Sequence, residues 1–294
     1  RMNTSIFRAG NLQNVISLDP FTIENTEVIF GPGSVIYGSD AIGGVMNFQT
    51  IKPRLSVDKK WDIHANISSR YSYANKEETT HGTLHIGTKK LASVSSFSFN
   101  QFGDLKMGKY GPDSYLRPFY VDQVENMDKI IQNANPRIQV PSGYDQQNVM
   151  QKFLYKPSER WEIQYGFHRS ATTSYPRYDR LIEVNTAGMP VSAVWNYGPQ
   201  IWQMNHFSVQ HFGDNLLYDA LTFRMAHQYF EESRIDRNFS GSNRYRLRTQ
   251  VEKVNALSIN IDLKKTLKKG ILYYGLESVG NKVSSQATSK NIQT

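Results

Sequence analysis

The chain has 294 residues, of which 39% are hydrophobic and 20% are charged, and its formal net charge is +8. A membrane-spanning helix needs about 20 mostly apolar residues in a row. Apolar runs in this sequence are only a few residues long, which excludes a protein that crosses a membrane with helices. The absence of cysteine excludes disulfide and thiolate chemistry. The positive charge by itself suggests nucleic-acid binding, but the lysines form no helical stripe that fits a groove, so we expect no nucleic-acid partner.

The first 55 residues predict a small α/β unit. A strand is expected over 23–30, glycine-rich turns over 31–44, and a second strand over 45–50. Pro53 and the polar residues around it predict a linker over 52–60 that leads into a different domain. No signal peptide is predicted in the first ten residues, so we expect an exported protein to begin upstream of Arg1.

Residues 23–48 carry the most specific pattern, IENTEVIFGPGSVIYGSDAIGGVMNF. The glycines are suited to tight turns with positive φ, and no lysine followed by serine or threonine is present to bind a nucleotide phosphate. This pattern resembles the end of the plug domain of TonB-dependent outer-membrane receptors, in which a strand with paired acidic residues precedes a GPGS-like turn. It departs from many members at Phe30, where they carry arginine. The residues that carry the resemblance, and for which it implies a structural or gating role, are Glu24, Glu27, Gly31, Pro32, Gly33, Tyr37, Gly38, Asp40, Gly43 and Gly44.

The resemblance implies a function for the whole protein. Such receptors import scarce nutrients through a 22-stranded barrel that a plug occludes, and TonB, energised from the inner membrane, pulls on the plug through a segment that we expect upstream of Arg1. Residues 23–48 differ from the corresponding plug segment of related glycan importers. This difference favours a ferric siderophore or another metal chelate as cargo, with haem and cobalamin as further candidates. The resemblance implies no enzyme activity, no cofactor, no resident metal, and a location in the outer membrane of a Gram-negative bacterium, among its lipid and lipopolysaccharide.

From residue 61 onward the dominant signal is alternation with a period of two. In the first segment Trp61, Ile63 and Ile67 share one face, and polar residues such as His64 and Arg70 share the other. An apolar face and a polar face on each strand are typical of a membrane β-barrel with a wet interior. We therefore predict a mainly β fold: part of an α/β plug domain in residues 1–55, followed by the N-terminal part of a transmembrane antiparallel β-barrel in residues 56–294.

About nine strands are predicted, against the expected 22. Since about 240 residues hold nine strands, 22 strands would need roughly 590 residues, so we expect about half of the barrel to be missing from this chain. The clear segments are 61–73, 160–169, 217–229 and 257–263; the weaker ones are 79–88, 91–103, 147–155, 200–212 and 271–283.

The predicted connections alternate in length. Short ones fall near residues 89–90, 156–160, 213–216 and 264–270, and long ones at 104–146, 174–199 and 231–248, with one short outer loop near 75–78. Outer-membrane barrels have short periplasmic turns and longer outer loops, so the alternation assigns the two ends. It also places lysine pairs at the periplasmic ends of strands, where they solubilise the ends and meet phospholipid head groups.

The candidate cargo contacts come from the long loops. Arginine suits anionic chelates because its guanidinium matches carboxylate and phosphate geometry, and tyrosine rings stack on planar cargo; solvated loops, contacts with lipopolysaccharide phosphates and an outer aromatic girdle are the alternatives. No metal site is predicted, since His81 and His85 are about 13 Å apart along one strand. The candidates are Tyr178, Tyr197, Arg234 and Arg237.

Two other classes of protein share parts of this pattern. A passive porin or a structural outer-membrane barrel shares the alternation but does not need the plug motif. A soluble lectin-like β-protein shares the strands, and folding only in detergent or lipid would exclude it.

Overall fold

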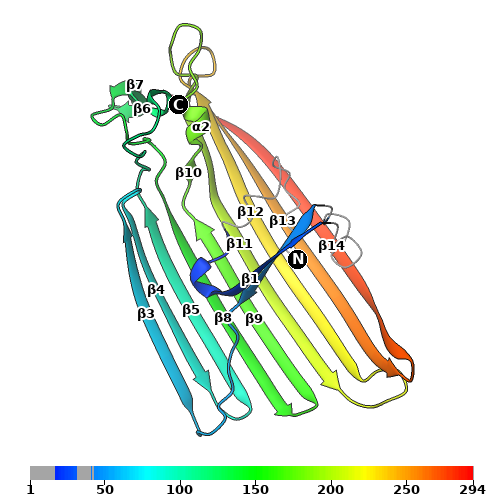
Figure 1. Ribbon diagram of the computed structural model, residues 1–294. Coiled ribbons are helices and arrows are strands. Elements are labelled where there is room, and N and C mark those ends of the chain that lie inside the picture. The colour runs from blue at the N-terminus through cyan, green and yellow to red at the C-terminus, as the bar shows by residue number, and fades with distance from the viewer. Residues whose placement is uncertain (1–16, 32–40, 42, 294) are drawn as a thin grey trace.

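The computed structural model describes residues 17–31, 41 and 43–293. Most of them form one curved antiparallel sheet (Figure 1), in which each strand lies beside its neighbour in the sequence. The path along the sheet contains nine strands, which confirms the predicted number. In chain order they are β3 (Asp62–Ser72), β4 (Glu77–Gly87), β5 (Leu91–Phe102), β8 (Tyr144–Ser158), β9 (Trp161–Thr172), β11 (Ser192–Phe212), β12 (Ala220–Asn238), β13 (Arg246–Leu267) and β14 (Gly270–Asn291).

The alternation of the sequence sorts side chains onto two faces of this sheet, as predicted. Ile63 and Ile67 on β3 are 60% and 81% exposed on the outer face. On the inner face, His81, Ser98 and Asn148 lie side by side on β4, β5 and β8 and are buried. The outer edges of β3 and β14 pair with no other strand of the described residues, so within these residues the sheet is not closed into a barrel.

The two ends of the sheet differ. Short turns join β4 to β5, β8 to β9, β11 to β12 and β13 to β14 at one end, which we call the short-turn end (Figure 1). The long connections lie at the other, the long-loop end. The connection between β3 and β4 is also there and is short, as predicted. In the part of the chain that the structure describes, no helix is long and apolar enough to cross a membrane.

The long connections contain structure of their own. The first carries 3-10 helix η3 (Asp113–Tyr115) and a hairpin of β6 (Phe119–Val124) and β7 (Met127–Gln132); the second carries β10 (Tyr175–Pro176), which pairs with β11, and helix α2 (Tyr178–Leu181). The predicted loop over 231–248 is wrong in extent, because β12 continues to residue 238 and β13 begins at 246. Residues 231–238 and 246–250 are mostly polar on both faces, so the alternation of polarity that marks a strand is absent from their sequence.

The plug segment is a separate two-stranded sheet of β1 (Ile23–Phe30) and β2 (Gly44–Thr50), which crosses the inner face of the large sheet (Figure 1). Gly31 and Gly44 take positive φ values of 90° and 153°, as predicted for this motif. At Gly44 a Cβ atom would lie 2.6 Å from the carbonyl oxygen of Ile29, so only glycine fits where the two strands meet. A domain boundary between residues 55 and 56 stays a prediction.

Asp219 fixes the short turn between β11 and β12. Its carboxylate accepts hydrogen bonds from Lys265 Nζ (2.6 Å) and from the backbone N–H of Thr266 (2.7 Å). These bonds, that of Lys265 first, lower the pKa of Asp219 to about 2.

The lowered pKa of Asp219 stabilises the folded protein in a pH-dependent way. Since an unfolded aspartate titrates at about 3.9, the stabilisation is present above that pH and is lost as the pH falls through about 2. We expect Asp219→Asn to lower the melting temperature at about pH 6 but not at about pH 2. Thermal unfolding followed by circular dichroism checks this, and equal losses at both pH values would contradict it.

Candidate functional site

The candidate site lies where the plug segment meets the inner face of the sheet, and Asp19 is at its centre. Asp19 Oδ1 accepts a hydrogen bond from the backbone N–H of Phe21 (3.1 Å) and so caps 3-10 helix η2 (Pro20–Thr22). Asp19 Oδ2 accepts one from Ser98 Oγ (2.6 Å), which in turn lies 2.7 Å from His81 Nδ1. Asp19 is 7% exposed and Ser98 is fully buried. Because a buried carboxylate needs partners, this network fixes the plug segment to β4 and β5.

Apolar and aromatic contacts surround the same helix. The Phe21 ring stacks on His81, with ring centroids 4.8 Å apart and planes 17° apart. Leu18 packs against a cluster of apolar residues on the inner face of β11, β12 and β13. In a water-filled pore these apolar side chains would be exposed to water. The cluster consists of Trp202, Phe230 and Val254. The inner face therefore contains a docking surface shaped for the plug.

Lys152 on β8 holds the end of the plug sheet. Its ammonium group donates hydrogen bonds to Thr50 Oγ1 (2.5 Å), to the carbonyl oxygen of Ile51 (2.9 Å) and to that of Thr50 (3.2 Å). An ammonium group has three donors, so the plug segment satisfies all of them. The last residue of β2 is thus bound to β8, the strand next to β5, which carries the Ser98 contact of Asp19.

The described motif residues stabilise the plug itself. Glu24 forms an ion pair with Arg54 in the linker (3.1 Å), and Glu27 accepts a hydrogen bond from Asn47 on β2 (3.1 Å). The backbone N–H of Gly31 donates to the carbonyl of Gly43 (3.2 Å), which closes the two-stranded sheet. The remaining motif residues lie outside the described residues: Pro32, Gly33, Tyr37, Gly38 and Asp40.

At the long-loop end, Arg177 organises an aromatic group that includes the candidate Tyr197. The guanidinium carbon lies 5.0 Å from the ring centroid of Tyr197 and 5.3 Å from that of Trp195. Arg177 also donates to the Tyr197 hydroxyl (2.8 Å) and, through two nitrogens, to both carboxylate oxygens of Asp179. The hydrogen bonds from Arg177 lower the pKa of Asp179, so this pair is charged at neutral pH.

Tyr178, the first residue of α2, covers a buried arginine. The guanidinium of Arg117 lies 5.6 Å from the centre of the Tyr178 ring and donates to the carbonyl oxygens of Leu181 (2.9 Å) and Val140 (3.2 Å). Arg117 is 5% exposed, and burial raises the pKa of Tyr178. Arg117 therefore joins the two longest loops beneath this ring.

The two candidate arginines have different surroundings. Arg234 lies opposite Tyr197 in the β11–β12 register and donates to Gln250 Oε1 (2.5 Å), while its buried Nε has no hydrogen-bond partner among the described residues. Arg237 is 3% exposed and donates through both terminal nitrogens to the carboxylate of Asp128 on β7 (2.5 and 2.6 Å). Arg234 has an unused donor, whereas Arg237 binds the β6–β7 hairpin.

A luminal cavity of about 480 Å³ lies beside the plug. Gln49 and Thr50 line it from the plug, and Lys152, His168 and His206 line it from the barrel wall. Its lining is largely polar, which suits water or a hydrophilic solute. Within residues 17–31, 41 and 43–293, no three acidic, histidine or cysteine side chains are grouped so that they could hold a metal ion.

The residues that dock the plug are not among those that the sequence predicts. Lys152 carries a usable signal, since a lysine in the middle of the polar face of a membrane strand has no solvent-exposed end to reach. Asp19 precedes Pro20, which indicates a helix cap, but nothing in the sequence pairs it with Ser98, 79 residues away.

Three comparisons with known proteins bear on this arrangement. Residues 1–45 match the family model described as "TonB-dependent Receptor Plug Domain". The chain is 21% identical to the Ferrioxamine B receptor of Salmonella typhimurium over 90% of its own length and 35% of that protein, and 25% identical to the Vitamin B12 transporter BtuB of Vibrio vulnificus over 53% and 20%. It thus spans about a third or less of these relatives. The solved structure of Copper transporter OprC has the same fold, with a TM-score of 0.67 and 11% identity, over 95% of this chain and 37% of that one.

Proposed function

Since this chain is a piece of a TonB-dependent receptor, we propose that the whole protein imports a scarce nutrient across the outer membrane of a Gram-negative bacterium. TonB supplies the energy by pulling on the plug from the periplasm. The end of the barrel that faces the periplasm is the short-turn end, because outer-membrane barrels have short periplasmic turns. The observation that carries the proposal is the bound plug segment, which is anchored to the barrel wall by Asp19 at its start and by Lys152 at the end of β2.

The plug contacts favour an energised importer over a passive porin. A passive porin has an open aqueous channel and needs neither a buried carboxylate at Asp19 nor an apolar docking surface in its lumen. Hydrogen bonds to charged groups contribute about 1.5–3 kcal/mol each, so several of them hold the plug until a mechanical partner acts. Removal of the plug therefore requires work, which TonB supplies in this proposal.

For the cargo we propose a metal chelate, with a ferric siderophore first and haem or cobalamin as further candidates. Arg234 supports an anionic cargo, because its side chain is only partly buried and it lies opposite Tyr197, which supplies an aromatic ring. Tyr178 lies on the same end of the sheet, in α2. Arg237 already binds Asp128, so it contributes to a cargo site by holding the β6–β7 hairpin in place.

Growth of a deletion strain on single iron or cobalamin sources tests the proposed function. We expect the strain to fail on one source and to recover when the full-length gene is supplied. Uptake of the corresponding radiolabelled chelate then identifies the cargo. Unchanged growth and uptake on every such source would contradict the proposal.

Arg234→Gln is expected to weaken binding of an anionic chelate about 10- to 100-fold, because a hydrogen bond to a charged group is lost. The control is Arg244→Gln, which removes a positive charge from the exposed loop after β12. Fluorescence quenching or isothermal titration with the purified full-length receptor measures the affinity. If both variants lose affinity equally, the effect is one of net charge and Arg234 has no direct contact.

A further inference from the structure

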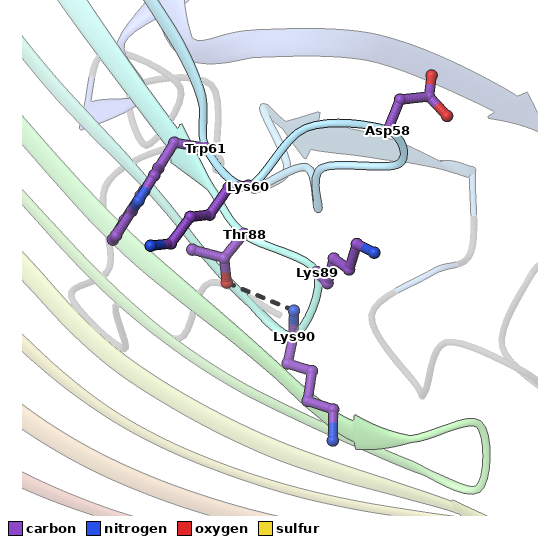
Figure 2. A pocket seen from close by; sticks show the side chains of 6 residues that line it. All are labelled: Asp58, Lys60, Trp61, Thr88, Lys89 and Lys90. Atoms are coloured by element: carbon purple, nitrogen blue, oxygen red, sulfur yellow. Dashed lines mark hydrogen bonds between the residues drawn. The ribbon is translucent and has the colours of Figure 1, made fainter.

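A pocket of about 510 Å³ lies at the short-turn end, between the linker that follows the plug and the turn that joins β4 to β5. The linker supplies one side and the turn the other, as Figure 2 shows. The residues that line the pocket are Asp58, Lys60, Trp61, Thr88, Lys89 and Lys90.

Both sides of the pocket are fixed by hydrogen bonds. Thr88 Oγ1 accepts from the backbone N–H groups of Lys90 (3.4 Å) and Leu91 (3.0 Å), which sets the turn. The linker is joined to this turn by the backbone N–H of Ser56, which donates to the Thr88 carbonyl (3.0 Å). The linker backbone crosses directly over Gly87, where a Cβ atom would lie only 2.4 Å from the carbonyl oxygen of Arg54. The pocket is therefore built into the fold.

The charges around the pocket are unbalanced. Three lysines line it against the single carboxylate of Asp58, and no ion pair of any of the three is found among the described residues. Lysines at neighbouring short turns do have partners: Lys156 pairs with Glu159 (2.7 Å), and Lys265 pairs with Asp219 (2.6 Å). The unpaired ammonium groups at this pocket thus favour an anion that comes from outside the chain.

Trp61 indicates where that anion lies. It is 55% exposed and directly precedes β3, on which Ile63 and Ile67 face outward. Tryptophan at the end of a lipid-facing strand sits at the level of the head groups. In Figure 2 the Lys60 side chain extends beside the Trp61 ring, while Lys89 and Lys90 extend from the turn. Lipid-facing Trp61 at the mouth of a cationic pocket favours a lipid head group over a free anion.

We propose that this pocket binds the head group of an anionic phospholipid in the periplasmic leaflet. The charges of Lys60 on the linker and of Lys89 and Lys90 on the turn attract the lipid phosphate from different sides of the pocket. The bound lipid bridges the two and holds the linker against the barrel rim while the plug moves. This inference rests on the outer-membrane location in the proposed function, and it does not depend on the cargo.

The test is native mass spectrometry of the full-length receptor in detergent, titrated with phosphatidylglycerol or with phosphatidylcholine. Lys89→Gln/Lys90→Gln is expected to weaken phosphatidylglycerol binding about fivefold per lysine removed and to leave phosphatidylcholine binding unchanged. Lys89→Arg/Lys90→Arg, which keeps the charge, should retain binding and shows that the turn tolerates substitution.

The matched control is Lys268→Gln/Lys269→Gln, which removes the same charge from the short turn between β13 and β14. An equal loss of phosphatidylglycerol binding in this control would overturn the proposed site, as would full displacement of the lipid by inorganic phosphate alone. Radiolabelled cargo uptake is measured on the same variants. Loss of lipid binding with uptake retained supports the site, and absence of uptake in the parent receptor contradicts only the proposed function.

Discussion

Replacing Asp128 with alanine is expected to release the β6–β7 hairpin from the end of β12. The substitution leaves the Arg237 guanidinium buried without its carboxylate, and Arg237 is 3% exposed. Breaking a buried pair by removal of one partner costs about 3–5 kcal/mol, which exceeds the contribution of a two-stranded hairpin on its own. Hydrogen exchange should therefore show that residues 119–132 lose protection while β12 keeps its own.

The control for this prediction is Asp122→Ala on the same hairpin, since Asp122 is exposed and, within the described part of the chain, accepts only a local hydrogen bond from the backbone of Gln123. Asp128→Leu/Arg237→Met replaces both charges with apolar groups and should restore much of the protection, because no unpaired charge remains. Unchanged exchange over 119–132 in Asp128→Ala would show that the ion pair does not hold the hairpin.

The second large effect is expected from Lys152→Met combined with Asp19→Asn. The first change removes three hydrogen bonds to the end of β2, and the second weakens the charged contact with Ser98. Each bond to a charged group contributes about 1.5–3 kcal/mol, so the plug segment should detach far more often. The expected result is entry of a large antibiotic into cells that produce the variant, or frequent channel openings in planar bilayers.

Lys156→Met is the matched control, because Lys156 lies on the same strand but pairs with Glu159 at the short-turn end. We expect cells with this variant to remain as resistant as the parent. If the double variant is also as impermeable as the parent, other contacts retain the plug and these two anchors are not decisive.

The local rules of the sequence account for most of the sheet. Alternation identified nine strands and their two faces because one face of each strand is apolar over most of its length, as in Ile63 and Ile67. Alternation did not predict the end of β12, where Glu231, Asp236 and their neighbours are polar on both faces. The strand continues there because its backbone forms hydrogen bonds with β13, although neither face of this part is apolar.

The site was less accessible to sequence reasoning. Glycines such as Gly44 were identified because positive φ is a local backbone requirement. The partners of Asp19, Lys152 and Arg237 lie between 79 and 109 residues away in the sequence. Such pairs depend on the register of the whole sheet, and no local pattern predicts them.

We propose that the whole protein is a plugged importer that TonB energises. The most direct measurement is uptake of the radiolabelled chelate by cells that carry the full-length receptor, with and without TonB and with the inner-membrane proton gradient dissipated. The account predicts that cargo still binds at the cell surface but that uptake is lost in both cases. Uptake that continues at the parental rate without TonB would contradict it and indicate a passive channel.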